Sequence, residues 1–162
     1  MTGASDPIAI RIDDLTGREI ADLLQGHLAS AIECSPESAV HALNLDSLRR
    51  PDITLWSAWQ GDSLAGCGAL RELSKAHGEV KSMRTEASHI RQGVAAKLLE
   101  HMIAIARERG YERLSLETGN TSDFAAARAL YTKHGFAPCP PFDGYVEDGF
   151  SVYMTRAIQP IS

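Results

Sequence analysis

The segment from Glu79 to Gly110 constrains the fold more than any other part of the chain. A strand is expected over Glu79–Thr85, and the clearest helical pattern follows it over Val94–Arg109. Gly93 stands directly before the helix, and Gly110 stands where a left-handed residue commonly ends one. The spacing therefore predicts a strand, a glycine-containing turn and a long amphipathic helix. The side chains expected to face the core are Val94, Leu98, Leu99, Met102, Ile103 and Ala106.

The turn before this helix has the features of an anion-binding site. A turn that enters a helix aims unpaired backbone N–H groups at one point, and the helix dipole adds about half a positive charge there. Such a site suits a pyrophosphate. Gly93, Ala95 and Ala96 would let phosphates approach the backbone closely, and Arg91 would add a side-chain contact. Small residues also occur in strand-to-helix turns that bind nothing, so this segment alone leaves both interpretations open.

The other segments predict an α+β fold around a mostly antiparallel sheet. Helices are expected from Thr16, from Ser35–Pro36 and from Asp123 to His134, in addition to the central one. The order of elements is then strand, two helices, three strands, helix, strand, helix and a late strand. The strands are expected at Ile8–Ile12, Ile53–Trp59, Leu64–Leu70, Glu79–Thr85, Arg113–Thr118 and Val152–Thr155.

Length, composition and charge exclude several classes of protein. A chain of 162 residues fits one domain, expected here over residues 1–162. The net charge of −5 and the scattered basic residues argue against a nucleic-acid partner. The three cysteines lie far apart and the histidines lack metal-binding spacing, so reduced thiols and no metal site are expected. No apolar run approaches the length of a membrane span and no signal-peptide pattern opens the chain. A cytoplasmic protein without a membrane partner is expected.

Two motifs resemble the core of the GNAT superfamily of acetyl-CoA-dependent acetyltransferases. The first lies in the run KSMRTEASHIRQGVAAKLLEHMIAIARERGYERLSLETG, where the family signature Arg/Gln-x-x-Gly-x-Gly/Ala opens the central helix. The second is LYTKHGF, Leu130 to Phe136, which fits the family's L-Y-x-x-x-G-F. The resemblance covers Ile53 to Phe136 well and the two ends loosely. It implies a GNAT-like mixed, mostly antiparallel sheet flanked by helices, with a splayed central pair of strands.

The chain departs from the family pattern at two positions. Ile90 stands where the first motif has Arg or Gln, and Arg91 is displaced by one position. Because backbone amides do most of the phosphate binding, we expect the site to survive this change. Phe124 stands where many members carry an asparagine that bonds the pantetheine arm, and Asn120 is the candidate substitute.

The resemblance also implies which residues act. Tyr131 would be the general acid that protonates the sulfur of CoA, although a tyrosine on an apolar helix face can also be a plain core residue. Glu79 is the candidate general base and Glu117 is its rival; a surface or cross-strand charge is the alternative for both. Backbone N–H groups around Met83 and Thr85 would bond the pantetheine arm and polarise the thioester carbonyl. The residues expected to bind acetyl-CoA are Met83, Arg84, Thr85, Arg91, Gln92, Gly93, Val94, Ala95 and Ala96.

The function implied is transfer of an acetyl group from acetyl-CoA, as cosubstrate, to the amine of a small molecule. Phe142 and Tyr145 would wall the acceptor pocket or only pack on the sheet. Arg71, Lys81 and Arg84 would bind a substrate carboxylate or form a solvated strand face. Two other functions stay open: a non-catalytic acyl-CoA sensor on the same fold and a protein N-acetyltransferase. A homodimer is expected.

Overall fold

The computed structural model describes residues 7–24, 48–89 and 92–159. Its strands form one seven-stranded sheet. The strands are β1 (Ile8–Ile12), β2 (Ile53–Gln60), β3 (Ser63–Ser74), β4 (His77–Thr85), β5 (Arg113–Gly119), β6 (Ala137–Cys139) and β7 (Ser151–Ala157). The helices that lie wholly within the described residues are α3 (Val94–Arg109) and α4 (Ala125–Lys133), with short 3-10 turns η3 (Ala87–His89) and η4 (Ser122–Phe124). The strand order across the sheet is β1-β2-β3-β4-β5-β7-β6.

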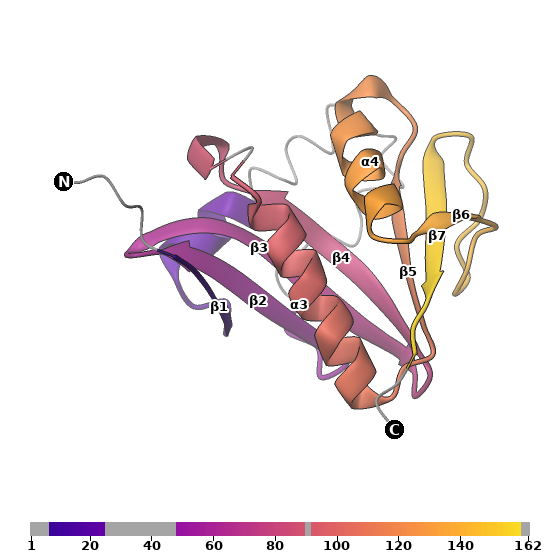
Figure 1. Cartoon of the computed structure of the whole chain (residues 1–162), viewed down its shortest axis with the longest axis horizontal. Helices are drawn as coiled ribbons and strands as arrows, with labels where there is room; N and C mark the ends of the chain where they lie inside the picture. Colours follow the sequence, from indigo (N-terminus) through magenta and orange to yellow (C-terminus); the bar gives the residue numbers. More distant parts are fainter. Residues whose placement is uncertain (1–6, 25–47, 90–91, 160–162) are drawn as a thin grey trace.

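Two hydrophobic cores lie on the two faces of this sheet. Helix α3 lies across β2, β3 and β4 on one face and contacts all three (Figure 1). Its buried side chains pack with alternate residues of the strands, such as Trp56 and Val80. A second core holds Leu55 and Cys67 from the opposite face together with Ile20 and Leu24 from a helical stretch at residues 18–24. The sheet is therefore covered on both faces.

The central strands β4 and β5 run parallel and pair over only part of their length. The ladder joins four residue pairs and ends at Val80 opposite Leu116. Beyond that point β4 continues to Thr85 and β5 continues to Gly119, with no pairing between them. Their other neighbours stay paired, because β3 follows β4 to Thr85 and β7 follows β5 to Gly119. The expected splayed pair of strands is confirmed.

A bulge in β4 sits where the splay begins. The register between β3 and β4 slips between Cys67 and Ala69, so β4 carries one extra residue there. Ser82 takes the left-handed conformation at this point, with φ of 54°, and is buried. The thiol of Cys67 donates to the Ser82 carbonyl at 3.4 Å. A bulge releases one residue from the ladder and bends the strand, which explains why β4 leaves β5 here.

Most predicted elements that lie within the described residues are confirmed, with two differences. The late strand pattern contains two strands, because β6 forms before β7. The first helix begins at Arg18, and the hydroxyl of Thr16 donates to Asp14 instead of capping it. The helix expected from Ser35–Pro36 lies outside the described residues, as does the continuation of the first helix beyond residue 24.

Candidate active site

The N-terminus of α3 carries no side-chain cap from the described residues. Gly93 precedes the helix in the left-handed conformation, with φ of 81°, and its carbonyl already accepts from Lys97 at 3.0 Å. No described side chain caps this end, and the first turn holds no acidic residue. Gln92 turns back to donate its side-chain amide to the carbonyl of Ser88. The backbone amides of the first turn, at Val94, Ala95 and Ala96, have no acceptor within the helix itself. Arg91 lies outside the described residues.

The β5-facing edge of β4 lies beside this helix end. Because the ladder to β5 stops at Val80, residues 81–85 have no strand partner on that side. Thr85 and Arg84 pair with β3 on the other side. The side chain of Met83 points into the core, where a Cβ added at Gly68 would lie 2.6 Å from its sulfur. The glycine thus makes room for Met83, and the backbone of this stretch is what the strand offers to a ligand.

Helix α4 brings Tyr131 to the splayed end of β5. Arg128 of this helix donates to the carbonyls of Gly119 and Thr121, at 2.6 and 2.9 Å, and so fastens α4 to the end of β5. Tyr131 follows three residues later, on the same side of the helix. It is only 6% exposed and packs edge-on against Phe136. Burial raises the pKa of Tyr131 to about 12, so the phenol keeps its proton at neutral pH.

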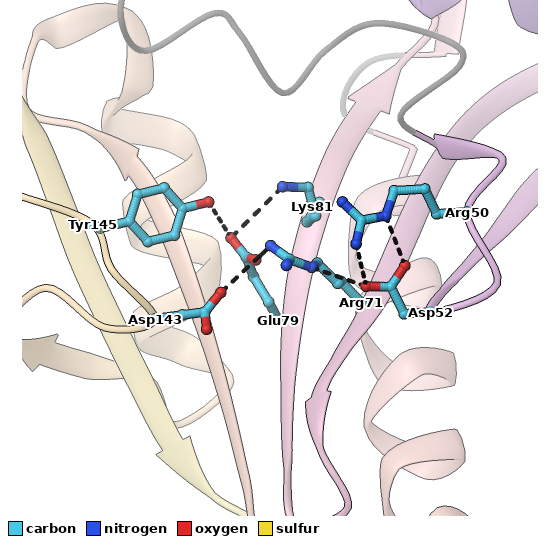
Figure 2. Close-up of polar contacts among 7 residues, drawn as sticks. All are labelled: Arg50, Asp52, Arg71, Glu79, Lys81, Asp143 and Tyr145. Atoms are coloured by element: carbon cyan, nitrogen blue, oxygen red, sulfur yellow. Dashed lines mark hydrogen bonds and ion pairs between the residues drawn. The ribbon is translucent and has the colours of Figure 1, made fainter.

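Glu79 is the centre of a buried polar network on the face of β4 opposite α3 (Figure 2). Its side chain is only 2% exposed. The hydroxyl of Tyr145 donates to its Oε2 at 2.6 Å, and the Lys81 ammonium lies 3.9 Å from the same oxygen. The Arg71 guanidinium lies 3.9 Å from Oε1. A buried carboxylate is costly unless it is paired and hydrogen-bonded, and these three groups supply that compensation.

Arg71 connects this carboxylate to two others. It stands directly opposite Glu79 in the antiparallel ladder of β3 and β4. Its Nε donates to Asp52 Oδ2 at 3.3 Å, and another of its nitrogens lies 3.4 Å from Asp143 Oδ2. Asp52 also pairs with Arg50 (Figure 2). Three carboxylates thus surround the Arg71 guanidinium, which favours a role in holding the network over docking a substrate carboxylate.

Glu117 lies on β5 near the same network. Glu79 pairs with Ser115 across the β4–β5 ladder, so Glu117, two residues further, shares that face. Its Oε2 accepts a hydrogen bond from the Ser151 hydroxyl at 2.6 Å. Burial raises the pKa of Glu117, and the charges of Asp148 and Glu79 raise it further, against the opposing Ser151 hydrogen bond. Glu79 and Glu117, two carboxylates with different surroundings, therefore lie near the point where β4 and β5 separate.

The β6–β7 loop, residues 140–150, covers this face with aromatic rings. Phe142 packs edge-on against both Tyr145 and Tyr153, with ring centroids 5.2 and 5.9 Å apart. Asp143 and Gly144 both have positive φ, 48° and 81°, and the amide of Tyr145 donates to the Phe142 carbonyl at 2.9 Å. These features define a type I′ turn, which Asp-Gly favours. The turn delivers Tyr145 and Asp143 to the network around Glu79.

Phe124, one of the two departures from the family motif, and Asn120, its candidate substitute, have structural roles here, while Ile90, the other departure, lies outside the described residues. Phe124 packs against the backbone of Gly119, where an added Cβ would lie 2.4 Å from its ring, and contacts Phe150 edge-on. Asn120 donates its side-chain amide to the carbonyl of Gly149. Both residues thus support the β6–β7 loop. The side-chain amide of Asn120 is engaged there.

Sequence reasoning pointed to Glu79, Tyr131 and Tyr145 as candidates but did not predict the contacts that surround them. Asp143 carried a turn signal in its Asp-Gly pair, but nothing in the sequence linked it to Arg71. Ser151, which bonds Glu117, follows an ordinary loop. These contacts join segments far apart in the chain, so they become visible only with the sheet order. Within the described ranges no cluster of three metal-ligating side chains occurs and no helix is long and apolar enough to cross a membrane.

Comparison with known sequences identifies the family. Residues 20–136 match the model of the acetyltransferase (GNAT) family. The chain is 57% identical over 149 residues to YsnE of Bacillus subtilis, covering 92% of this chain and 99% of YsnE. It is 44% identical over 149 residues to YedL of Escherichia coli, covering 92% and 94%. Both are named as uncharacterised N-acetyltransferases. A protein named IAA acetyltransferase from Azospirillum brasilense is 35% identical over 125 residues, 76% of this chain and 80% of that protein.

Solved structures have the same fold. An acyl-CoA N-acyltransferase of Klebsiella pneumoniae superimposes with a TM-score of 0.75 at 27% identity, over 94% of this chain and 98% of that one. A GNAT acetyltransferase of Elizabethkingia anophelis, solved with acetyl-CoA bound, superimposes with a TM-score of 0.68 at 21% identity, over 93% and 98%. At that identity the second likeness concerns the fold alone.

Proposed function

The chain belongs to the GNAT family of acetyltransferases, and from this premise we propose that it transfers the acetyl group of acetyl-CoA directly to the amine of a small molecule. The observation that carries the proposal is the open N-terminus of α3 beside a splayed strand pair, with a buried carboxylate, Glu79, and a buried phenol, Tyr131, near that splay. The first feature suits a pyrophosphate. The other two suit proton transfer.

Acetyl-CoA would lie with its pyrophosphate on the first turn of α3, against the amides of Gly93, Val94, Ala95 and Ala96. Small side chains there allow close approach, and no carboxylate in the first turn repels the phosphates. The pantetheine arm would run along residues 83–85 of β4, whose backbone is not paired with β5. Arg91 and Gln92 would border the site.

The transfer needs two proton movements. The acceptor enters as an ammonium and gives one proton to Glu79, and the free amine then attacks the thioester carbonyl carbon. When the C–S bond breaks, the departing thiolate takes the phenolic proton of Tyr131. The phenolate then takes the remaining excess proton from the new amide nitrogen, so that amide and CoA thiol leave and Glu79 releases its proton to water. The raised pKa of Tyr131 keeps the acid loaded before each turnover.

Glu79 is our choice for the base because it sits on β4, two residues before the unpaired stretch that would hold the thioester. Glu117 remains the rival, since burial raises its pKa and a base works best when that value lies near the working pH. The two are separated by comparing Glu79→Gln with Glu117→Gln. The variant that lacks the true base should lose most of the transfer rate. The fall in rate toward low pH, which reports protonation of that base, should also disappear from its pH–rate profile.

The test is acceptor-dependent release of CoA thiol with a panel of amines that includes amino acids, polyamines and aminoglycosides; IAA, taken from the name of the Azospirillum relative, is added to the panel as a further candidate acceptor. Tyr131→Phe should lower kcat by about 10²- to 10⁴-fold, because it removes the proton donor. Its affinity for acetyl-CoA, measured by calorimetry, should stay within about twofold, because the ring remains. Unchanged kcat in this variant would contradict the role of Tyr131.

A second candidate, a non-catalytic acyl-CoA sensor, would bind acetyl-CoA without consuming it with any acceptor. The buried Glu79 network favours the enzyme, since a sensor has no use for a proton acceptor in this place. Acetylation of a protein substrate is separated from small-molecule transfer by adding peptides to the same panel. A cytoplasmic location and a homodimer stay predictions, the latter checked by light scattering.

A further inference from the structure

The contact between Tyr145 and Glu79 links the β6–β7 loop to the centre of the site. The hydroxyl of Tyr145 lies 2.6 Å from Glu79 Oε2, and both side chains are largely withdrawn from solvent (Figure 2). Burial raises the pKa of Tyr145, and the charge of Glu79 raises it further. The phenol therefore keeps its proton, so the hydrogen bond runs from tyrosine to carboxylate.

The two oxygens of Glu79 have different surroundings. Oε2 accepts from Tyr145 and lies 3.9 Å from the ammonium of Lys81. Oε1 lies 3.9 Å from Arg71 and has no hydrogen-bond partner among the described residues, although it is buried. A carboxylate oxygen offers about two lone pairs, so Oε1 keeps its capacity to receive a proton. Because only Oε2 is hydrogen-bonded, Oε1 is the oxygen of Glu79 that can accept a proton from the acceptor amine.

The loop that carries Tyr145 is held against the sheet by a second polar contact and by its aromatic rings. Asp143, two residues earlier, lies 3.4 Å from Arg71, the cation that faces Oε1. Phe142 contacts both Tyr145 and Tyr153, and these two tyrosine rings also contact each other. One tight turn thus supplies Tyr145, which donates to Oε2 of Glu79, and Asp143, which pairs with Arg71 beside Oε1. Moving this loop would change the surroundings of both oxygens at once.

We propose that Tyr145 is a positioning residue for acetyl transfer. Its hydroxyl holds Oε2 of Glu79, so that Oε1 receives the proton of the acceptor amine. The β6–β7 loop must therefore be packed against the sheet for that step. This inference rests on the proposed function, with Glu79 as the base. Among residues 7–24, 48–89 and 92–159, the charged and titratable groups facing Glu79 are Arg71 from β3, Lys81 from β4, Glu117 from β5 and Tyr145 from the loop, with Asp143 acting through Arg71.

The kinetic test compares Tyr145→Phe with Tyr153→Phe. A donated hydrogen bond stabilises a carboxylate over its protonated form, so Tyr145→Phe should move the acid limb of the kcat/KM profile about one pH unit higher. At a fixed pH on that limb the rate then falls about tenfold. Tyr153 belongs to the same aromatic cluster, but its hydroxyl donates to the carbonyl of Val146. Its removal should leave the limb in place.

A limb that stays in place in Tyr145→Phe, or that moves equally in both variants, overturns the inference. Absence of transfer by the unmodified protein contradicts the proposed function instead.

A second measurement needs no turnover: carbon NMR of the tyrosine ring carbon that bears the hydroxyl, with Tyr145 assigned through its Phe variant. In Glu79→Gln the chemical shift of this Tyr145 carbon at neutral pH should change, because its hydroxyl loses the charged acceptor, and that of Tyr153 should not. An unmoved Tyr145 signal would show that the contact is absent in solution and overturn the inference.

Discussion

Three side chains of the site differ in what surrounds their ionisable atoms, and that difference sets their chemistry. Tyr131 is buried among apolar groups, which raises its pKa to about 12. Glu117 is half-buried beside other carboxylates, which raises its pKa as well. Glu79 is more deeply buried but stands against two cations and a phenol. Sequence patterns pointed to all three residues, yet they could not rank Glu79 against Glu117, because the ranking depends on neighbours from other strands and the β6–β7 loop.

The pKa of Tyr131 makes a prediction about pH dependence. A raised pKa means that the phenol stays protonated, and so able to act as an acid, until the pH approaches about 12. The kcat profile of the unmodified protein should therefore show no loss on its basic side that belongs to Tyr131 below about pH 10. A basic limb below that pH which disappears in Tyr131→Phe would contradict this assignment.

Among the elements, α3 was the most predictable from sequence, while the bulge in β4 and the whole of strand β6 were not predicted. The apolar spacing of α3 and the glycines at its ends placed the helix at Val94–Arg109, as the structure has it. The bulge at Ser82 carried no sequence signal, since a serine can occupy an ordinary strand position. Strand β6 was missed because it is three residues long and contains Pro138. Its pairing with β7 depends on the finished sheet edge.

The two glycines that flank α3 offer a matched test of the phosphate site. Gly93 and Gly110 both have φ of 81°, and an added Cβ at either meets nothing within 4 Å. Alanine at either position should thus cost about 1–2 kcal/mol of stability through backbone strain alone. Only Gly93→Ala should also weaken acetyl-CoA binding, by several-fold, because only that end is proposed to hold the pyrophosphate. Denaturant unfolding and calorimetry measure the two effects, and equal loss of affinity in both variants would contradict the placement.

At the scale of the whole molecule, the sequence predicted the class of fold and its splay through the family resemblance, while the register came only from the structure. Alternation cannot show that β4 pairs with β5 over just four positions. It also cannot show that Asp143 reaches Arg71, since one lies in the β6–β7 loop and the other on β3. The site is thus a product of sheet order, assembled from β3, β4, β5, α4 and the β6–β7 loop.

Acetyl-CoA should stabilise the whole fold, because its proposed site joins α3 to the open edge of β4. A ligand that binds only the folded state at about 100 times its Kd adds about 2.7 kcal/mol. For a chain of this size each kcal/mol shifts the melting temperature by about 2–4 °C. A rise of roughly 5–10 °C in a thermal scan is therefore expected. Gly93→Ala should show a smaller rise than Gly110→Ala at the same ligand concentration.

The central claim is that this chain moves an acetyl group onto an amine, and isotope-labelled transfer tests it most directly. Purified protein is incubated with acetyl-CoA labelled in its acetyl group and with the amine panel, and products are read by mass spectrometry. A labelled N-acetyl product is expected from at least one amine, and Tyr131→Phe should form it much more slowly. Acetyl-CoA binding without labelled product from any amine or peptide would contradict this claim and favour the sensor.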